Sequence, residues 1–230
     1  MCFACTDSTV PPIPRPAELT STSSPPKRSA CSATTRMQSS SSAMFAVAAA
    51  ATANVALEED CVRIVAEHAD RFGGLDVLVN SAGLGIGGTV ESVQAKHIDL
   101  QLGVNLRGLL LVTREAIPHL KQSKGWIFNL ASIAGTTATP GLTVYGATKA
   151  AVIALTRSQN LELETAGVRA VAICPGFVDT AMAAWSGIPP DQMIRPEDCA
   201  EVVRMCLRLS PYARIPQVVI ERVGADGLAG

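Results

Sequence analysis

Tyr145 and Lys149 are the residues whose types and spacing most directly suggest acid–base chemistry. They stand four positions apart in Tyr145-Gly-Ala-Thr-Lys149, and residues at i and i+4 of a helix lie on one face. A tyrosine hydroxyl titrates near pH ~10 in water, and a fixed cation nearby favours the phenolate. Such a pair also arises by chance, so it is weak alone. It predicts a tyrosine that exchanges a proton near neutral pH.

Ser132 is the second candidate. It ends an apolar run, Gly125-Trp-Ile-Phe-Asn-Leu-Ala-Ser132, and lies 13 residues before Tyr145. The run is typical of a buried parallel strand, and ligands of open α/β sheets bind at the carboxyl ends of such strands. A hydroxyl at this edge can polarise a carbonyl group while a tyrosine protonates it. The alternative interpretation is a serine that caps a turn or a helix.

Two further segments follow apolar runs directly. Asn80-Ser-Ala-Gly83 contains small residues that let the backbone pass close to a flat ligand. Pro175-Gly176-Phe-Val-Asp-Thr180 turns the chain sharply and presents the Thr180 hydroxyl, which can bind an amide or phosphate oxygen. We therefore expect both segments at the same ligand-binding edge of the sheet.

Hydrophobic periodicity predicts the elements that position these residues. An apolar stripe favours a helix over 58–72 that ends at Gly73 and Gly74. The other elements expected are strands over 76–80, 126–130, 168–174 and 217–221, and helices over 93–120, 143–164 and 196–209. Alternation of strands and helices predicts an α/β fold with a parallel sheet covered on both faces.

With Val104-Asn105-Leu-Arg-Gly108, these motifs resemble the single-domain branch of the short-chain dehydrogenase/reductase family, from about Asn54 to about Ile220. Four motifs in the family's order and spacing are far more specific than any one of them. The resemblance implies a Rossmann-like, doubly wound parallel sheet. It also implies an NAD- or NADP-dependent oxidoreductase that interconverts a carbonyl and a secondary alcohol by hydride transfer, similar to 3-oxoacyl and ketone reductases.

The resemblance also implies roles for single residues. Tyr145 would be the general acid/base, Lys149 would hold the nicotinamide ribose and lower the tyrosine pKa, Ser132 would steady the substrate oxygen, and Asn105 would anchor a proton-relaying water. The residues expected along the cofactor are Asn54, Asn80, Ala82, Gly83, Tyr145, Lys149, Pro175, Gly176, Val178 and Thr180. Packing of the Tyr145 helix against its twin would produce a homodimer or homotetramer.

The sequence departs from the family before residue 54. The family opens with a strand, a T-G-x-x-x-G-I-G turn and a helix, and that turn seats the pyrophosphate. No such turn precedes Asn54, which itself stands where the family commonly has an aspartate. The N-terminal βαβ portion is therefore absent or replaced. We expect the strand at 77–79 to lack its usual partner and to expose an apolar edge, with Ala46–Ala53 as a candidate outer strand.

Residues 1–53 form a separate segment in this interpretation. Residues 1–43 are rich in Ser, Thr, Pro and Ala and show almost no apolar periodicity. They are expected to be a disordered tail or the product of a misassigned exon or a frameshift. A transit peptide is the alternative, because the segment is basic and serine-rich. Residues 54–230 would be a truncated catalytic domain.

A second cofactor hypothesis rests on Gly83-Leu-Gly85-Ile-Gly-Gly88, which fits the dinucleotide pattern G-x-G-x-x-G and follows a strand. A long helix, rather than a second strand ending in an acid, follows it. We therefore interpret it as a flexible loop after the Asn80 motif. Trp185 lies where the family carries a substrate lid, and it either lines the substrate pocket or packs the lid.

Composition excludes several classes of protein. Apolar residues make up 48% of the chain and the net charge is −1, with no basic stripe for nucleic acid. No apolar run approaches the ~20 residues of a membrane span. The seven cysteines are scattered, as reduced thiols of a cytoplasmic protein are, and the three histidines have no metal-ligand spacing. A small carbonyl or alcohol is the expected partner. The alternative to an active enzyme is an idle or regulatory chain that pairs with a full-length paralogue.

Overall fold

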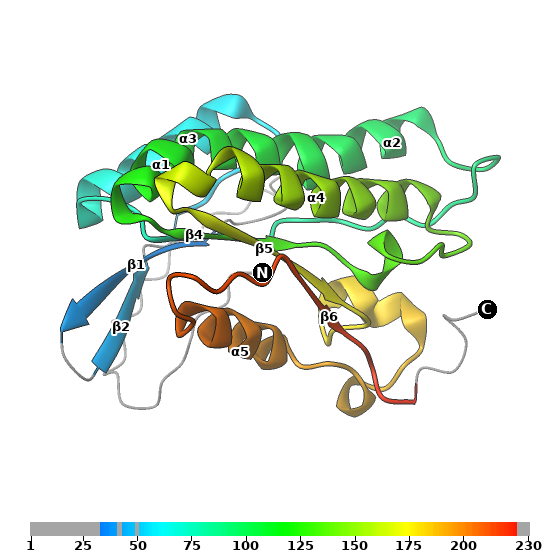
Figure 1. Cartoon of the computed structure of the whole chain (residues 1–230). Helices are drawn as coiled ribbons and strands as arrows, with labels where there is room; N and C mark the ends of the chain where they lie inside the picture. The colour runs from blue at the N-terminus through cyan, green and yellow to red at the C-terminus, as the bar shows by residue number, and fades with distance from the viewer. Residues whose placement is uncertain (1–32, 41–42, 49–50, 225–230) are drawn as a thin grey trace, which may run out of the picture.

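The structure is a computed structural model that describes residues 33–40, 43–48 and 51–224 of the 230-residue chain (Figure 1). The helices and strands, in chain order, are β1 (Ala33–Ser40), β2 (Ala43–Ala48), α1 (Glu58–Phe72), β3 (Val77–Asn80), α2 (Ala95–Leu102), α3 (Leu109–Ser123), β4 (Trp126–Leu130), α4 (Thr143–Glu162), β5 (Arg169–Pro175), α5 (Pro196–Leu207) and β6 (Gln217–Ile220). Shorter helical segments are η1 (Gly103–Gly108, a π-helix) and the 3₁₀ segments η2 (Ile133–Gly135), η3 (Glu164–Ala166), η4 (Ala181–Ser186) and η5 (Pro190–Gln192).

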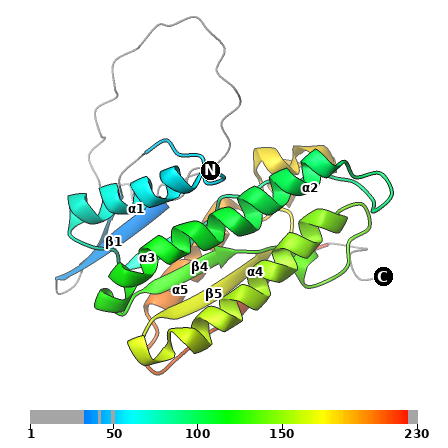
Figure 2. The same cartoon turned by 90° about the horizontal axis from the view of Figure 1, so that it is seen from above.

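The sheet has the strand order β2-β1-β3-β4-β5-β6, and β3 to β6 are parallel. Among the described elements, α1, α2, α3 and α4 lie over one face and α5 covers the other (Figures 1 and 2). The α/β fold with a parallel sheet covered on both faces is confirmed. Because β3, β4 and β5 run the same way, the residues that follow their carboxyl ends meet at one edge.

The N-terminal segment differs from the sequence expectation. Strands β1 and β2 form an antiparallel hairpin within residues 33–48, where we predicted a tail without regular structure up to residue 43. Ala33 to Thr35 pair antiparallel with Val77 to Val79, so the prediction of an unpaired edge on β3 was wrong. Backbone pairing needs only an extended segment, which composition does not exclude. β2 is the outermost strand, where the Ala46–Ala53 candidate was placed. Residues 1–32 lie outside the described part.

The core consists of two layers that alternate along each strand. Leu78 and Ile127 are fully buried and pack toward α1 and α3, whereas Phe128 and Val171 pack on the opposite face toward α5. Successive residues of a strand point to opposite faces, so a strand buried on both sides must be apolar throughout. This explains why each of these runs is continuously hydrophobic in the sequence.

Most predicted boundaries are confirmed to within a few residues. Helix α1 spans the predicted range, and Gly73, with φ 72°, ends it by donating its backbone N–H to the Ala69 carbonyl at 2.7 Å. The helix expected over 93–120 begins at Ala95, runs through η1 and α3 and ends at Ser123, with Pro118 inside it. The π-helical η1 carries Asn105, and π-helical segments are frequent at functional sites.

Candidate active site

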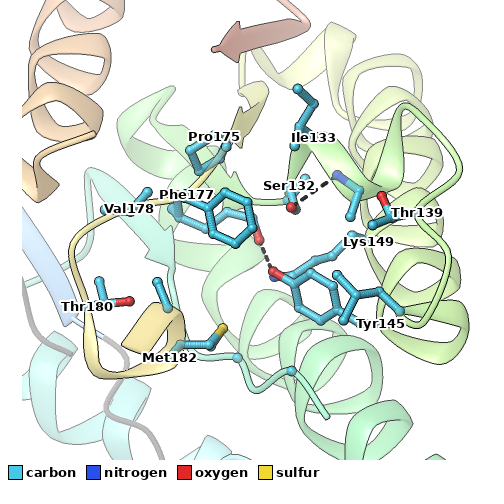
Figure 3. A pocket seen from close by; sticks show the side chains of 18 of the residues that line it. Ser132, Ile133, Thr139, Tyr145, Lys149, Pro175, Phe177, Val178, Thr180 and Met182 are labelled. Carbon is cyan, nitrogen blue, oxygen red and sulfur yellow. Dashed lines mark hydrogen bonds between the residues drawn. The ribbon is translucent and has the colours of Figure 1, made fainter. Parts of the chain in front are cut away.

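Ser132 follows the carboxyl end of β4 in extended backbone conformation. Its Oγ accepts a hydrogen bond from the Ala134 backbone N–H at 3.2 Å (Figure 3), so it caps η2 as the alternative interpretation proposed. Its hydroxyl also lies close enough to the Tyr145 hydroxyl to lower the Tyr145 pKa. The capping and the site interpretations are therefore compatible, because the cap holds the serine while its hydroxyl reaches Tyr145.

Tyr145 and Lys149 project from the first half of α4 on one face of the helix. The Lys149 Nζ donates to the Leu130 carbonyl at 2.7 Å and lies 5.6 Å from the centre of the Tyr145 ring. Leu130 ends β4, so this bond ties the helix to the strand that leads to Ser132. Figure 3 shows Ser132, Tyr145 and Lys149 together. The structure thus brings together the three side chains that the sequence singled out.

Burial controls the protonation of this pair. The pKa of Tyr145 is raised above its ordinary value of 10, because burial disfavours the phenolate more than the neighbouring Ser132 hydroxyl favours it. Burial also lowers the pKa of Lys149 to about 8. The direction for Tyr145 is opposite to the lowering that we expected from Lys149. In this state the tyrosine keeps its proton at neutral pH and is poised as an acid.

The lowered pKa of Lys149 predicts a pH dependence of folding. Between about 8 and the ordinary lysine value of 10.5, the unfolded chain binds a proton that the folded chain has released. The free energy of unfolding contributed by Lys149 therefore rises with pH across this window. We expect the stability of wild type relative to Lys149→Met to be higher at about pH 9.5 than at about pH 7.5. Urea unfolding measures this difference, and a constant difference would contradict it.

Two glycines let η2 and α4 approach backbone to backbone. A Cβ on Gly135 would lie 2.6 Å from the Lys149 carbonyl carbon and 2.8 Å from the Ala150 nitrogen, and one on Gly146 would lie 2.9 Å from the Ala134 carbonyl oxygen. Contacts this short are not tolerated between real atoms. Only glycine at these positions allows the turn that carries Ser132 to pack directly on the helix that carries Tyr145.

Asn105 is buried between η1, α4 and the loop after β3. Its Oδ1 accepts from the Leu84 backbone N–H at 2.8 Å, and its Nδ2 donates to the Leu84 carbonyl at 2.9 Å and to the Thr148 Oγ1 at 3.0 Å. Thr148 in turn donates to the Tyr145 carbonyl at 2.7 Å. Asn105 thus links the loop along the cavity to the Tyr145 helix. It does not itself line the main cavity.

The Asn80 motif divides between two environments. Asn80 is buried and its Nδ2 donates to Thr113 at 3.0 Å and to Asn129 at 2.8 Å, so its side chain belongs to the packing between β3, β4 and α3. Ala82 packs against the core. Gly83 lies at the cavity, where a Cβ would come 3.4 Å from the Lys149 Nζ and 3.5 Å from the Asn105 Oδ1. Gly83 therefore leaves open a hollow beside both polar groups.

The segment after β5 is held in place by backbone hydrogen bonds. Gly176 donates to the Ile220 carbonyl at 2.9 Å, and Ile194 donates to the Phe177 carbonyl at 2.9 Å. These bonds place Pro175, Gly176, Val178 and Thr180 along the cavity, as the sequence predicted. Asn54 lies apart from it: the Asn54 Oδ1 accepts from the Ala56 N–H at 3.1 Å, before α1. The cavity lining thus includes these four residues but not Asn54.

One large cavity of about 790 Å³ contains the three polar side chains. Sequence reasoning missed much of its wall, which includes Ile133, Thr139, Leu142, Phe177 and Met182. Their proximity to Ser132, Tyr145 and Thr180 in the sequence was the available signal. Trp185 lines the cavity and also contacts the Phe177 ring edge-on, with ring centres 5.9 Å apart. Trp185 therefore lines the cavity and packs on Phe177, and its role toward a substrate stays a prediction.

The alternative dinucleotide fingerprint at 83–88 is wrong. A phosphate-binding glycine turn opens directly into a helix, but the next helix, α2, begins only at Ala95. Gly83, Gly85 and Gly87 instead form one wall of the cavity, and Gly88 donates to the Gly141 carbonyl at 2.7 Å. The loop interpretation is confirmed.

Within the described residues, no group of three or more His, Cys, Asp or Glu side chains is arranged to bind a metal ion. Cys61, Cys174, Cys199 and Cys206 are buried free thiols. In the same ranges, we find no helix with the length and hydrophobicity needed to cross a bilayer.

Comparison with known proteins identifies the family. Residues 27–187 match the short chain dehydrogenase family, a range that contains Ser132, Tyr145, Lys149 and Thr180. The chain belongs to the short-chain dehydrogenase family. An uncharacterized oxidoreductase of Staphylococcus aureus (strain MRSA252) is 33% identical over 171 residues, which cover 74% of each protein. Membership of this family identifies the chain as an oxidoreductase.

Solved structures agree with this assignment. An alcohol dehydrogenase from the archaeon Thermococcus sibiricus, complexed with 5-hydroxy-NADP, is 28% identical with a TM-score of 0.69; the match covers 74% of this short-chain dehydrogenase and 73% of that chain. A 3-ketoacyl-(acyl-carrier-protein) reductase from Brucella melitensis, complexed with NADH, is 31% identical with a TM-score of 0.66, over 74% of each chain. The Rossmann-like architecture is therefore shared with both.

Proposed function

We propose that this short-chain dehydrogenase interconverts a carbonyl compound and a secondary alcohol, with NAD or NADP as the hydride carrier and Tyr145 as the general acid/base. The observation that carries the proposal is that the neighbouring Ser132 and Tyr145 hydroxyls line one cavity together with the buried Lys149 ammonium. A hydroxyl pair beside a cation is the arrangement that a carbonyl oxygen needs when it gains a proton.

In the reduction, Ser132, Tyr145 and Lys149 have different roles. Ser132 donates a hydrogen bond to the carbonyl oxygen and orients it toward Tyr145. As the carbonyl is reduced, Tyr145 transfers its proton to the oxygen, which becomes the alcohol hydroxyl. The raised pKa of Tyr145 means that the proton is present at neutral pH. The Lys149 ammonium stabilises the resulting phenolate and, with a pKa of about 8, can return a proton to it. Oxidation of the alcohol reverses these steps.

The residues present fit the nicotinamide end of the cofactor. The hollow that Gly83 leaves beside Lys149 and Asn105 suits a ribose hydroxyl, and the Thr180 hydroxyl at the cavity suits the carboxamide. When bound, the nicotinamide supplies or accepts the hydride. Complexes of similar proteins with NADH and 5-hydroxy-NADP support this choice.

A second candidate function is that of an idle or regulatory chain that pairs with a full-length paralogue. The phosphate end of the cofactor site favours it. The first glycine of the sequence is Gly73, and β1, the strand beside β3, is antiparallel. A parallel strand there would direct a glycine turn and a helix N-terminus toward the pyrophosphate. The antiparallel β1 instead ends at the opposite edge of the sheet.

A titration of the purified 230-residue chain with NADH and with NADPH distinguishes the two functions. Nicotinamide fluorescence reports binding directly and does not require a substrate. Saturable binding in the micromolar range supports the proposal of an active enzyme. The nucleotide that binds more tightly is then the preferred cofactor. A folded chain that binds neither ligand would contradict the enzyme and support the idle chain. Lys149→Met is the informative variant, because loss of the ribose contact should weaken binding of both ligands.

A further inference from the structure

The lining of the active-site cavity is nearly free of charge. Among the described residues that line it, Lys149 is the one with a charged side chain, and its ammonium already donates to the Leu130 carbonyl. The other polar groups of the wall are hydroxyls, the Cys199 thiol and the Trp185 indole N–H. Away from Lys149, a carboxylate or phosphate of a ligand would lose water without gaining a cation, and an unpaired buried charge is strongly disfavoured.

The outer part of the cavity presents large apolar side chains that are incompletely covered. Met182 is 40% exposed and Trp185 is 65% exposed, and Trp185 stacks edge-on against Phe177. Apolar surface of this kind at the entrance of a cavity is suited to be covered by an apolar ligand group. In Figure 3, Phe177 and Met182 flank the space in front of the Tyr145 hydroxyl.

Gly85 borders this space at a narrow point. A Cβ on residue 85 would lie 3.4 Å from the Tyr145 Cδ2 and 3.7 Å from the Met182 Sδ. The absence of a side chain at Gly85 therefore leaves the passage between Tyr145 and Met182 open. Gly87, which lines the same cavity, has a different environment: its Cβ would meet the Gly141 carbonyl oxygen, 3.6 Å away, and neither of those side chains.

We infer that the cavity selects an uncharged ketone, or the matching secondary alcohol, with an apolar substituent that passes Gly85 and lies against Met182, Phe177 and Trp185. The inference rests on the proposed function for the position of the carbonyl at Ser132 and Tyr145. Gly85 and Met182 determine the size and the charge of the substituent that is accepted.

Equilibrium binding to the full chain tests the ligand class without requiring turnover. The probes are cyclohexyl methyl ketone and its carboxylated analogue, 4-acetylcyclohexanecarboxylate, read by Trp185 fluorescence. The second tryptophan, Trp126, is buried, so the change in fluorescence is expected from Trp185. A titration of the Trp185→Phe variant measures the collisional quenching that must be subtracted. We expect the neutral ketone to bind at least about tenfold more tightly, because the carboxylate finds no partner. Equal affinities, or no saturable binding of the neutral ketone, would overturn the inference.

Variants at the two positions test their roles. Met182→Lys places a cation at the apolar wall and should shift the affinity ratio toward the carboxylated ketone by about fivefold. Gly85→Ala should weaken binding of the cyclohexyl ketone about fivefold relative to acetone, since a methyl group fills the passage. The matched control is Gly103→Ala, which lies outside the cavity lining and for which the ratio should hardly change. The same ratio for both alanine variants would contradict the role of Gly85.

Turnover then separates the inference from the proposed function. The turnover assay uses saturating NADH or NADPH. If the chain binds the neutral ketone selectively but reduces neither ketone, the proposed reaction is refuted and the inferred ligand class is supported. Reduction of both ketones with equal kcat/KM would support the reaction and overturn the ligand class. Preferential reduction of the cyclohexyl ketone supports both.

Discussion

Tyr145→Phe is expected to lower kcat for carbonyl reduction by about 10²–10⁴-fold, the range lost when a positioned acid is removed. The substitution deletes the hydroxyl that lies beside Ser132 and keeps the ring. That ring borders Gly85 and faces Lys149, so its packing should survive. Initial rates with NADH or NADPH and the preferred ketone measure the effect.

The second tyrosine of the sequence is a matched control. Tyr212 is 99% exposed, so Tyr212→Phe makes the same chemical change away from the cavity and should leave kcat at the wild-type value. Thermal unfolding of all three proteins separates loss of chemistry from loss of fold, and both variants should unfold close to wild type. A Tyr145→Phe variant that retains wild-type kcat would refute the assignment of the acid/base.

Gly135→Ala is expected to destabilise the fold by about 1–3 kcal/mol, the usual cost of forcing a group into a well-packed site. The new Cβ would lie within 2.8 Å of three backbone atoms of Lys149 and Ala150, and backbone atoms cannot rotate away. Relief requires η2 and α4 to separate. Because η2 follows Ser132 and α4 carries Tyr145, the same change should lower activity more than the loss of folded protein explains.

Gly103→Ala is the matched control for this prediction. Apart from its chain neighbours and the backbone of its own helix, no atom lies within 4 Å of a Cβ at that position, and the backbone there is helical, with φ −59°. Alanine restricts the unfolded chain and favours the helix, so this variant should be more stable by up to about 1 kcal/mol. Urea unfolding of the two variants should therefore give changes of opposite sign. Equal changes would contradict the close approach of η2 and α4.

Two predictions made above concern different states of the same site. They are the pH dependence of stability that Lys149 causes and the effect of Gly85→Ala on ligand binding. The first reports the cost of burying an ammonium before any ligand is present. The second reports the space available to a substrate next to Tyr145. Together with the two substitutions above, they test separately the electrostatics, the packing, the chemistry and the selectivity of one cavity.

Local patterns in the sequence determined the elements and the reacting groups. The runs at Val77–Asn80 and Trp126–Leu130 are apolar on both faces because both faces are buried, and the stripe of α1 ends at Gly73 because only glycine readily takes that φ. The i, i+4 spacing of Tyr145 and Lys149 placed both on one helix face. These features depend on neighbours within a few residues, so they can be read without the fold.

Only the tertiary structure decided the properties that depend on distant partners. Burial raises the pKa of Tyr145 against the expected direction, because desolvation is set by everything packed around the hydroxyl. The Asn80 side chain does not line the cavity, because its amide donates hydrogen bonds to Thr113 and Asn129 on other elements. The strand that pairs with β3, and the wall formed by Gly85 and Met182, likewise arise from segments far apart in sequence. Such long-range contacts leave no periodic signal in the chain.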